Sequence, residues 1–335
     1  MKILGIETSC DETAASIVTD KREILSHVIV SQIEEHQRFG GVVPEIASRS
    51  HLVYLEDIVK KTISSAKCSL NELDAIAVTS GPGLVGGLLV GLMFAKGLSF
   101  AINKPLLGIN HLEGHALTAR LTNKEVKFPY LMLLVSGGHC QILLVKGVGN
   151  YQKLGATLDD AVGEAFDKVA KMLGLEYPGG PIIEKLAALG DEYAYKLPLA
   201  MKGKSGCDFS FSGLKTAVRL IIEKENLTEK TIANICASFQ RTIAEILIDR
   251  LNNAALQIKP LGIGQLIIAG GVAANRYLFA CIAKAMLKHD FITIAPPISL
   301  CTDNGAMIAW AGVERFKAGL IDGLELAPKP RWPLY

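Results

Sequence analysis

Two apolar runs separated by a short polar stretch open the chain. Residues 3–6 and 14–18 are apolar, and the stretch between them contains the small polar sequence TSCD. Runs of this length on either side of a polar turn predict a β-hairpin. The pattern returns further on, because LGIETSCDETAASIV (4–18) aligns without gaps on LMLLVSGGHCQILLV (131–145). The repeat predicts that each half of the chain opens with one hairpin.

A second pair of related segments follows the two hairpins. IAVTSG (76–81) and LIIAGG (266–271) each predict a strand that runs into glycines ahead of a helix. The run 75–95 is uncharged and long enough to span a bilayer, but SGPG at 80–83 interrupts it. We therefore expect a buried strand, a turn and a packed helix in this region.

The clearest helical pattern lies between Thr157 and Gly174. Thr157 is expected to cap this helix with Asp160 three residues later, and Gly174 is expected to end it. Apolar residues at 161, 165, 169 and 173 share one face. Because strands and helices alternate in both halves, the pattern predicts two α/β lobes with a cleft in which phosphates bind.

The amino-acid composition narrows the possible classes of protein only a little. The 335 residues are half hydrophobic, and 35 basic against 33 acidic residues leave a net charge of +2, which neither demands nor excludes a nucleic-acid partner. Seven cysteines without a CxxC pair argue against a disulfide framework and for a reducing compartment. Carboxylates at residues 7, 11 and 12 leave no room for a signal peptide, so we expect a cytoplasmic protein.

The P-loop motif is absent, and we do not expect a Rossmann dinucleotide site. Two glycine turns remain as candidates for binding phosphates. VSGGH (135–139) offers accessible amides, and AGGVAAN (269–275) ends a strand ahead of a helix, with Asn275 able to donate and accept. A plain hairpin turn and close strand–helix packing explain the same patterns, so both interpretations stay open at this point.

HLEGH places two histidines four residues apart. On a helix, His111 and His115 share a face and are able to bind one metal, as in zinc proteases. Glu113 points away from that face, which argues against the water-activating base of a protease. Two histidines need a further ligand, and Asp303 is a candidate carboxylate. The alternative is a pair of unrelated surface histidines.

Basic residues gather around CDFSFSGLKTAV (207–218). They are Lys196, Lys202, Lys204, Lys215 and Arg219. A nucleic-acid surface combines such charges with aromatic side chains, here Phe209 and Phe211. A solvated surface without a partner also explains the charges, and the residues alone favour that interpretation.

Nine blocks together resemble the TsaD family, the tRNA adenosine threonylcarbamoyltransferases. In chain order they are GIETSCDETAASIV, GGVVPEIASRSH, TSGPGLVGGLLVG, HLEGHALTAR, LVSGGHCQILLV, YPGGPIIEKLA, FSFSGLKTAV, AGGVAANRYL and CTDNGAMIA. The blocks follow family order over nearly the whole chain, and their combination is far more specific than any single one.

The resemblance implies a fold and a reaction. The fold is α/β of the actin, Hsp70 and sugar-kinase (ASKHA) type, two duplicated lobes with a nucleotide cleft between them. The N-terminal lobe is expected at 1–110 plus about 300–335, and the C-terminal lobe at 111–299. The reaction transfers threonylcarbamoyl from threonylcarbamoyl-AMP to N6 of adenosine 37 in tRNAs reading ANN codons. It forms t6A and releases AMP, and ATP or AMP is expected to fit the same site.

The resemblance also implies roles for residues of this chain. His111, His115 and Asp303 would ligate one divalent ion, iron(II) or zinc. The donor substrate would be bound by Leu134, Val135, Ser136, Gly137, Gly138, Asp167, Gly180, Glu184 and Asn275. The tRNA would be contacted by Lys202, Lys204, Lys215 and Arg219, with stacking from Phe209 or Phe211. No residue is implied as a general base.

Partners and competing functions follow from the same comparison. Bacterial relatives act on tRNA with TsaB-like and TsaE-like proteins, and no membrane partner is implied. A catalytically idle nucleotide-binding subunit of the same complex is one alternative, but the idle paralogue lacks the histidine pair. A metallo-endopeptidase is disfavoured by the position of Glu113. A sugar kinase would need a catalytic aspartate where this chain has Ser136–His139.

Overall fold

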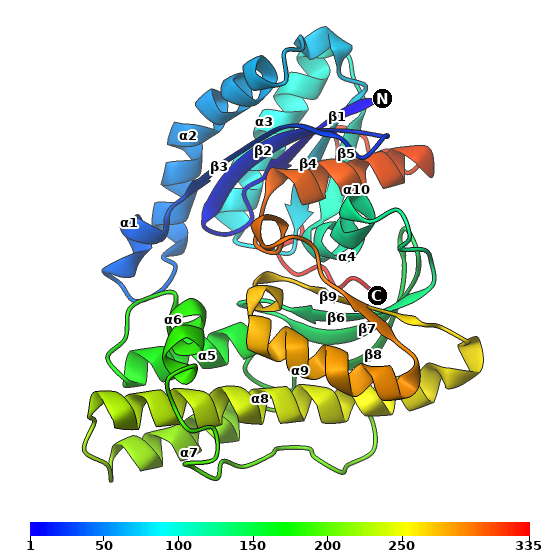
Figure 1. The fold of residues 1–335 in the computed structure, drawn as a ribbon. Helices are drawn as coiled ribbons and strands as arrows, with labels where there is room; N and C mark the ends of the chain where they lie inside the picture. Colours follow the sequence, from blue (N-terminus) through cyan, green and yellow to red (C-terminus); the bar gives the residue numbers. More distant parts are fainter. The chain divides into compact units, whose positions relative to one another are not determined.

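The computed structural model describes residues 1–335 and divides into two compact units (Figure 1). The first unit comprises 1–127, 147–151 and 302–335, and the second comprises 128–146 and 152–301. By contacts, the segment 111–127, which contains HLEGH, belongs to the first unit. The lobe boundaries expected from the sequence remain a prediction.

The first unit contains a five-stranded mixed sheet in the order β3-β2-β1-β4-β5. Its strands are β1 (Lys2–Glu7), β2 (Glu12–Thr19), β3 (Ile24–Ser31), β4 (Ala75–Gly81) and β5 (Leu106–Asn110). β1 pairs antiparallel with β2 and parallel with β4. The hairpin expected over 3–18 is therefore confirmed, and its tip is the polar stretch between β1 and β2.

Helices cover both faces of this sheet (Figure 1). They are α1 (Ile33–Gln37), α2 (Pro44–Ser65), α3 (Val85–Ile102), α4 (His111–Thr122) and α10 (Gly305–Lys317), with the 3₁₀ turn η1 (Leu70–Glu72). Leu4 and Ile6 pack with α2 and α3, whereas Gly5 between them faces α10, because successive strand residues point to opposite faces. The two faces thus have different helices, and α10 lies at backbone contact with β1.

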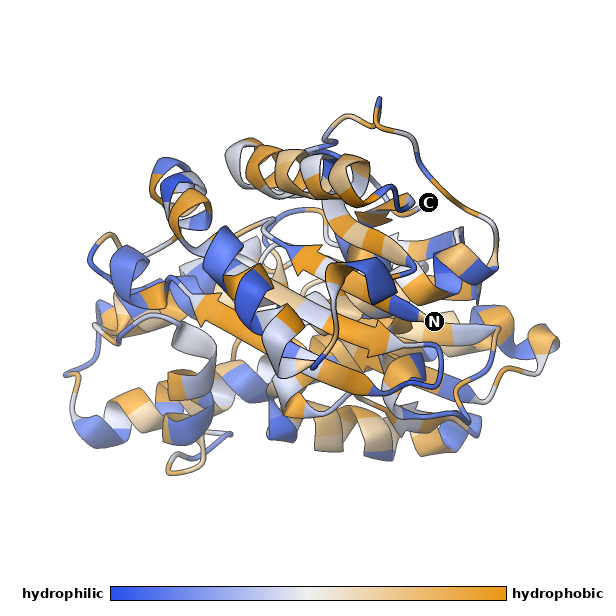
Figure 2. Cartoon of the chain, turned by 90° about the horizontal axis from the view of Figure 1, so that it is seen from above, coloured by the Kyte–Doolittle hydropathy of each residue, from blue (hydrophilic) through white to orange (hydrophobic).

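The second unit repeats the strand plan in the order β10-β9-β6-β7-β8. Its strands are β6 (Tyr130–Val135), β7 (Cys140–Gly147), β8 (Asn150–Ala156), β9 (Gln265–Ala269) and β10 (Ile292–Ile294). β6 pairs antiparallel with β7 and parallel with β9, as β1 does with β2 and β4. The duplication inferred from the sequence is therefore confirmed, and both sheets are mostly apolar, as Figure 2 shows.

Five helices belong to the second unit. They are α5 (Val162–Met172), α6 (Gly179–Ala187), α7 (Ser212–Ile222), α8 (Glu229–Ile258) and α9 (Arg276–Met286), with the 3₁₀ turns η2 (Lys259–Leu261), η3 (Gly271–Ala274), η4 (Leu287–His289) and η5 (Ile298–Leu300). Buried residues of β6 and of the long helix α8 belong to one core cluster, with Leu131, Leu133, Phe239 and Ile243 at or near zero exposure. This core is separate from the core of the first unit.

The expected start of the helix over 157–174 is wrong. The helix α5 begins at Val162, because Thr157 forms a bridge with Phe209 and its hydroxyl donates to the carbonyl of Asp160 at 2.6 Å. Both interactions hold the segment before Val162 in a turn. The expected end is confirmed, since Gly174 has φ +69 just beyond the helix.

The uncharged run 75–95 forms β4, a turn and the beginning of α3, as expected. By length and composition α3 is able to cross a membrane, and a third of its 18-residue window is buried. A single helix of this kind is weak support for a membrane span, because core helices pass the same test. Along α3, Val85, Leu89, Met93 and Phe100 are exposed. They form an apolar stripe at helical spacing.

Candidate metal centre and substrate loops

The helix α4 begins at the first histidine of HLEGH. β5 ends at Asn110, whose side-chain oxygen accepts the amide of Leu112 at 2.9 Å and so caps the helix. His111 and His115 therefore lie one turn apart, with ring centroids separated by 4.8 Å. Both are buried. Two surface histidines without a relation to each other are thus excluded.

Asp303 joins the two histidines from the turn ahead of α10. Its Oδ1 lies 3.1 Å from Nε2 of His115 and 3.3 Å from Nε2 of His111. Asn304 caps the helix that follows by accepting the amide of Met307 at 2.9 Å. The structure therefore brings together the three residues that the resemblance implies as metal ligands, within the first unit.

The other nitrogen of His111 faces the tip of the first hairpin. Nδ1 lies 3.0 Å from Oε2 of Glu7 and 3.1 Å from the hydroxyl of Ser9. Burial lowers the pKa of His111, but Asp303 and Glu7 outweigh it and hold that pKa well above its usual range. The cluster therefore favours positive charge. The sequence did not predict Glu7 or Ser9 as residues of the site, although both belong to the GIETSC block.

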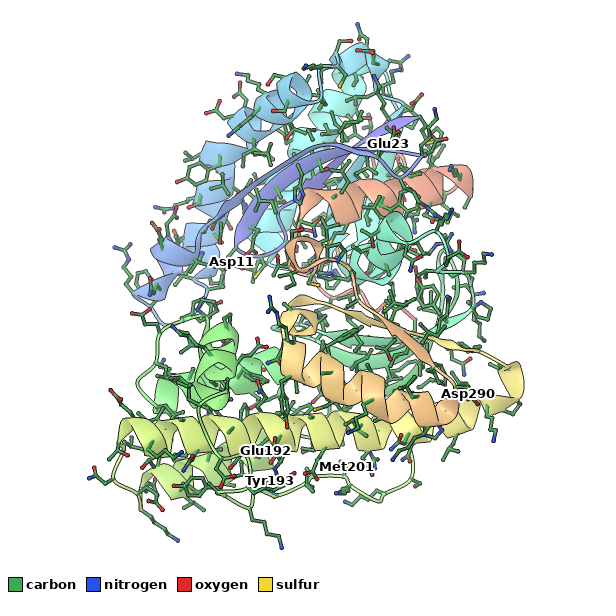
Figure 3. All side chains as sticks on the ribbon, viewed as in Figure 1. Asp11, Glu23, Glu192, Tyr193, Met201 and Asp290 are labelled. Carbon is green, nitrogen blue, oxygen red and sulfur yellow. The ribbon has the colours of Figure 1, made fainter.

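Further carboxylates lie at the start of β2. Glu12 is half-buried, and its pKa is raised well above its usual range by burial and by the nearby charges of Asp303 and Asp11. Asp11, labelled in Figure 3, is buried at the tip of the hairpin. Several carboxylates with little access to water are costly unless a positive charge offsets them.

The donor atoms fit a divalent cation. Two imidazole nitrogens and one carboxylate oxygen lie within 4.8 Å of one another, the donor set that zinc and iron(II) accept in proteins. Glu7 behind His111 is the type of outer carboxylate that orients a ligating histidine. The residues of this site therefore fit the metal that the family resemblance implies.

Glu113 turns away from the cluster. Its Oε1 accepts the amide of Gly149 at 2.9 Å and the hydroxyl of Tyr151 at 2.8 Å, and its Oε2 lies 3.0 Å from Arg315. The carboxylate is 2 % exposed and fully engaged. The prediction that Glu113 points away from the face of the two histidines is confirmed by this geometry.

The tip of the glycine hairpin between β6 and β7 is exposed to solvent. Leu134 and Val135 are buried in β6, so only their main chains are able to contact a ligand. Gly137 and Gly138 are exposed, and a Cβ at either position would meet nothing within 4 Å. The carbonyl of Ser136 accepts the amide of Gly163 at 3.2 Å, which docks the tip on the start of α5.

The remaining donor-binding candidates lie around α6 and α9. Asp167 accepts the amide of Gly179 at 2.8 Å, next to Gly180. Glu184 accepts the amide of Arg276 at 2.7 Å. Glu184 also borders a cavity of about 350 Å³, whose lining residues are Glu184, Ala187, Ala188, Gly190, Glu192, Ala237, Gln240, Arg276 and Tyr277. Glu192 is labelled in Figure 3.

Asn275 stands next to this cavity with its side chain engaged. Its Oδ1 accepts the amide of Leu278 at 2.9 Å, which caps α9, and its Nδ2 donates to Gln240 at 2.8 Å. Gln240 is one of the cavity residues. Asn275 therefore has a structural role in addition to the adenosine contact expected of it.

The basic residues expected to contact tRNA differ in whether they already form ion pairs within the protein. Lys202 lies 3.1 Å from Glu245, Lys215 lies 3.6 Å from Asp160 and Arg219 lies 3.5 Å from Glu223. Lys204 is exposed and forms no ion pair. It belongs to the loop of Met201, labelled in Figure 3.

The expected stacking of Phe209 or Phe211 on a base is wrong for this conformation. Both rings are 0 % exposed and belong to the core of the second unit, where their centroids lie 5.9 Å apart. Their alternation with small polar residues marks core positions rather than a nucleic-acid surface.

The fold and the cluster define a duplicated α/β protein with a two-histidine, one-carboxylate site. The model of the TsaD family, described as tRNA N6-adenosine threonylcarbamoyltransferase, matches residues 23–310. The chain belongs to this family. Proteins named tRNA N6-adenosine threonylcarbamoyltransferase from Brucella canis and Brucella ovis are each 54% identical to it over 343 residues, covering 100% of this chain and 95% of theirs.

Solved structures support the fold. HypF of T. kodakarensis matches with a TM-score of 0.63 at 12% identity, covering 95% of this chain and 48% of HypF. Component A of the (R)-2-hydroxyglutaryl-CoA dehydratase of Acidaminococcus fermentans matches with a TM-score of 0.57 at 16% identity, covering 95% and 99% of the two chains. At such low identities the likeness shows the fold alone, and it agrees with the ASKHA class expected from the sequence.

Proposed function

We propose that this protein transfers the threonylcarbamoyl group of threonylcarbamoyl-AMP to N6 of adenosine 37 in tRNAs that read ANN codons, forming t6A and releasing AMP. The observation that carries the proposal is 54% identity over the whole chain to relatives named as tRNA N6-adenosine threonylcarbamoyltransferases. The intact cluster of His111, His115 and Asp303 supports a catalytic chain over an idle subunit.

In this proposal His111, His115 and Asp303 hold one divalent ion, iron(II) or zinc. When bound, such an ion supplies positive charge that polarises a carbonyl or anchors a phosphate or carboxylate. Glu7 and Ser9 fix the ring of His111 from behind, so that its Nε2 and not its Nδ1 faces Asp303. The burial of both histidines limits the access of water to the donor atoms.

Residues of the second unit bind the donor substrate. The exposed amides at Gly137 and Gly138 approach the phosphate, because no Cβ obstructs them. The nucleoside portion lies by the cavity of Glu184, and Asn275 adjoins this cavity through its hydrogen bond to Gln240. Asp167 and Gly180 contact the same portion from the start of α6. These contacts support binding of ATP or AMP as well, since the recognised portion is shared.

The rate then depends mainly on orientation. The N6 amine of adenosine is a weak nucleophile because its lone pair is delocalised into the purine. The mixed anhydride of the donor is already activated, so holding both groups in line supplies much of the acceleration. The chain offers no side chain that we assign as general base.

Partners and location complete the proposal. The tRNA is the acceptor substrate, and proteins like TsaB and TsaE act with this chain in the cytoplasm. The apolar stripe of Val85, Leu89, Met93 and Phe100 on α3 supports a protein partner, because exposed apolar rows typically mark such contacts. A metallo-endopeptidase is disfavoured, since Glu113 is held by Arg315 and Tyr151.

The test is mass spectrometry of nucleosides from a tRNA that lacks modification at A37. The tRNA is incubated with threonylcarbamoyl-AMP and the protein, with and without TsaB-like and TsaE-like proteins. Wild type should form t6A, His115→Ala should form almost none, and His289→Ala, which changes a histidine paired with Asn252, should match wild type. Absence of t6A with wild type and both partners would overturn the proposal.

A further inference from the structure

The segment 322–335 is fixed to the first unit by its main chain. The amide of Lys329 donates to the carbonyl of Ser80 at 2.7 Å, and the carbonyl of Pro330 accepts the amide of Gly83 at 3.2 Å. At Gly81, with φ +145, a Cβ would lie 1.9 Å from the carbonyl oxygen of Lys329. Only glycine permits this approach, so the turn after β4 is shaped to hold the segment.

The same segment reaches the start of the metal-binding helix. The carbonyl of Trp332 accepts Nδ2 of Asn110 at 3.1 Å, and Asn110 is the cap residue directly before His111. On its other side the turn after β4 touches the hairpin, because the amide of Leu84 donates to the carbonyl of Ser9 at 2.8 Å. The hydroxyl of Ser9 is 3.1 Å from His111. Two independent routes thus connect the segment to the cluster.

The side chains that this backbone presents are basic and aromatic. Lys329 and Arg331 are exposed, and Arg331 makes no hydrogen bond or ion pair within the structure. Nζ of Lys329 lies 4.4 Å from the ring centroid of Trp332, which is half-buried. A fixed main chain that presents cations beside an aromatic ring suits unpaired RNA, where phosphates pair with cations and bases stack on rings.

We propose that residues 329–332 form a binding site for the single-stranded loop of the RNA substrate, beside the cluster of His111, His115 and Asp303. Arg331 pairs with a phosphate, and Trp332 together with Lys329 receives an unstacked base. This inference rests on the proposed function, because it names a surface for the RNA that carries the acceptor adenosine. It assigns that role to residues outside the basic group of the second unit.

The experiment measures binding of a fluorescently labelled, unmodified tRNA transcript to the full chain, with its partner proteins, over a range of salt concentrations. Arg331→Glu is compared with Lys61→Glu, which reverses one exposed positive charge on α2. Trp332→Ala is compared with Trp332→Phe, which retains a stacking face. Formation of t6A by each protein is recorded in parallel, and thermal unfolding reports whether each variant is folded.

Arg331→Glu should weaken binding roughly tenfold and reduce the salt slope by about 0.7, as expected for one lost phosphate contact on single-stranded RNA. Lys61→Glu should change neither quantity. Trp332→Ala should weaken binding roughly tenfold with little change of slope, and Trp332→Phe should keep most of the affinity.

Other outcomes overturn the inference. Equal losses from Arg331→Glu and Lys61→Glu would show a general effect of net charge. Unchanged tRNA binding by Arg331→Glu and Trp332→Ala, in a wild type that binds tRNA and forms t6A, would remove the site and leave the proposed function standing. If these variants instead lose a partner protein and keep tRNA, the surface binds protein. A further outcome is that the wild type binds tRNA but forms no t6A, while Arg331→Glu and Trp332→Ala bind tRNA more weakly. That outcome would support the site and reject the proposed function.

Discussion

Nη1 of Arg315 lies 3.0 Å from Oε2 of Glu113, and the pair joins α10 to α4. Glu113 stands between the two histidines of HLEGH, and Arg315 belongs to α10, which begins at Gly305, two residues after Asp303. The ion pair therefore connects the helix that contains the two histidines to the helix that follows Asp303. Glu113 thus helps to fix α4 against α10 without contacting the metal ligands itself.

Removing one partner of this pair should destabilise the protein strongly. Glu113 is 2 % and Arg315 15 % exposed, so either residue alone would leave a charge with little solvent. We expect Glu113→Ala to cost about 3 kcal/mol, and the double variant Glu113→Ala, Arg315→Ala to cost less than the two single changes added together. Urea unfolding of the four proteins gives the coupling.

Measuring the metal content of variants shows whether Glu113 positions the metal ligands or only stabilises the fold. Glu113→Ala should bind zinc or iron more weakly, because it removes the ion pair that joins α4 to α10 at the residue between the two histidine ligands. The matched control is the pair of Arg120 and Glu314, which joins the same two helices at 2.9 Å with similar burial. Its removal should cost comparable stability and leave metal affinity unchanged. Equal loss of metal in both pairs would contradict a specific role for Glu113.

Gly5 should tolerate no side chain. A Cβ there would lie 2.3 Å from the amide nitrogen of Ala309 and 2.4 Å from the carbonyl oxygen of Gly305, both of which are backbone atoms of α10. Because backbone cannot move aside cheaply, Gly5→Ala should destabilise the protein by about 2–3 kcal/mol. It should also displace the turn of Asp303 and lower metal content. Thermal unfolding and metal analysis check both effects.

Gly97 provides the opposite case. It lies within α3, is exposed, and a Cβ there would meet nothing within 4 Å. Gly97→Ala should therefore stabilise the protein by about 0.5–1 kcal/mol, because alanine loses less conformational entropy in a helix. If both alanine variants shift the unfolding midpoint in the same direction, the close contact of α10 with β1 is not what makes Gly5 necessary.

The repeats and motifs in the sequence predicted the architecture well, and local capping less well. Two hairpins and two glycine-ended strands were readable because apolar runs and turns are local signals, and β1 with β6 and β4 with β9 take equivalent places. The predicted start of α5 was wrong, because a long-range bridge between Thr157 and Phe209 overrides the local capping pattern.

Contacts between distant segments were predictable only where the residue types suggested a shared ligand. His111, His115 and Asp303 are such a case, because two histidines four residues apart need a further ligand, and the structure brings the three residues together. Glu7, which orients His111 across 104 positions of sequence, carries no local signal for that contact. Phe209 and Phe211 looked like a nucleic-acid surface, but their burial depends on the packing of the whole second unit.

Asp159 should stabilise the start of α7 in a pH-dependent way. Its carboxylate accepts the amides of Phe211 at 2.7 Å and Ser212 at 3.2 Å, and also two serine hydroxyls. Partial burial would raise its pKa, but these hydrogen bonds outweigh it and hold the pKa below its usual range. The stabilisation is therefore present above the unfolded-state pKa of about 3.9 and is lost as pH falls through the lower folded-state pKa.

Asp159→Asn should cost about 1 kcal/mol at neutral pH, because the amide keeps one acceptor oxygen but loses the stronger hydrogen bonds that a charged carboxylate accepts. The difference between wild type and variant should shrink as the pH falls below about 4, because the wild-type carboxyl is then protonated as well. Urea midpoints at neutral and acid pH measure this. Asp57→Asn, an exposed change on α2, should show no such difference. A constant gap between Asp159→Asn and wild type at all pH values would contradict the prediction.

Among the basic candidates, Lys204 should contribute most to tRNA binding. Its ammonium forms no ion pair, whereas Lys202 lies 3.1 Å from Glu245 and Lys215 lies 3.6 Å from Asp160. A lysine already paired must give up a carboxylate before it neutralises a phosphate, so its net gain is smaller. Lys204→Ala should weaken tRNA binding a few-fold and reduce the salt slope by about 0.7–0.9. Lys202→Ala and Lys215→Ala should do so less, and Lys61→Ala not at all; a larger effect from Lys202 or Lys215 than from Lys204 would show that RNA replaces the ion pairs of this surface.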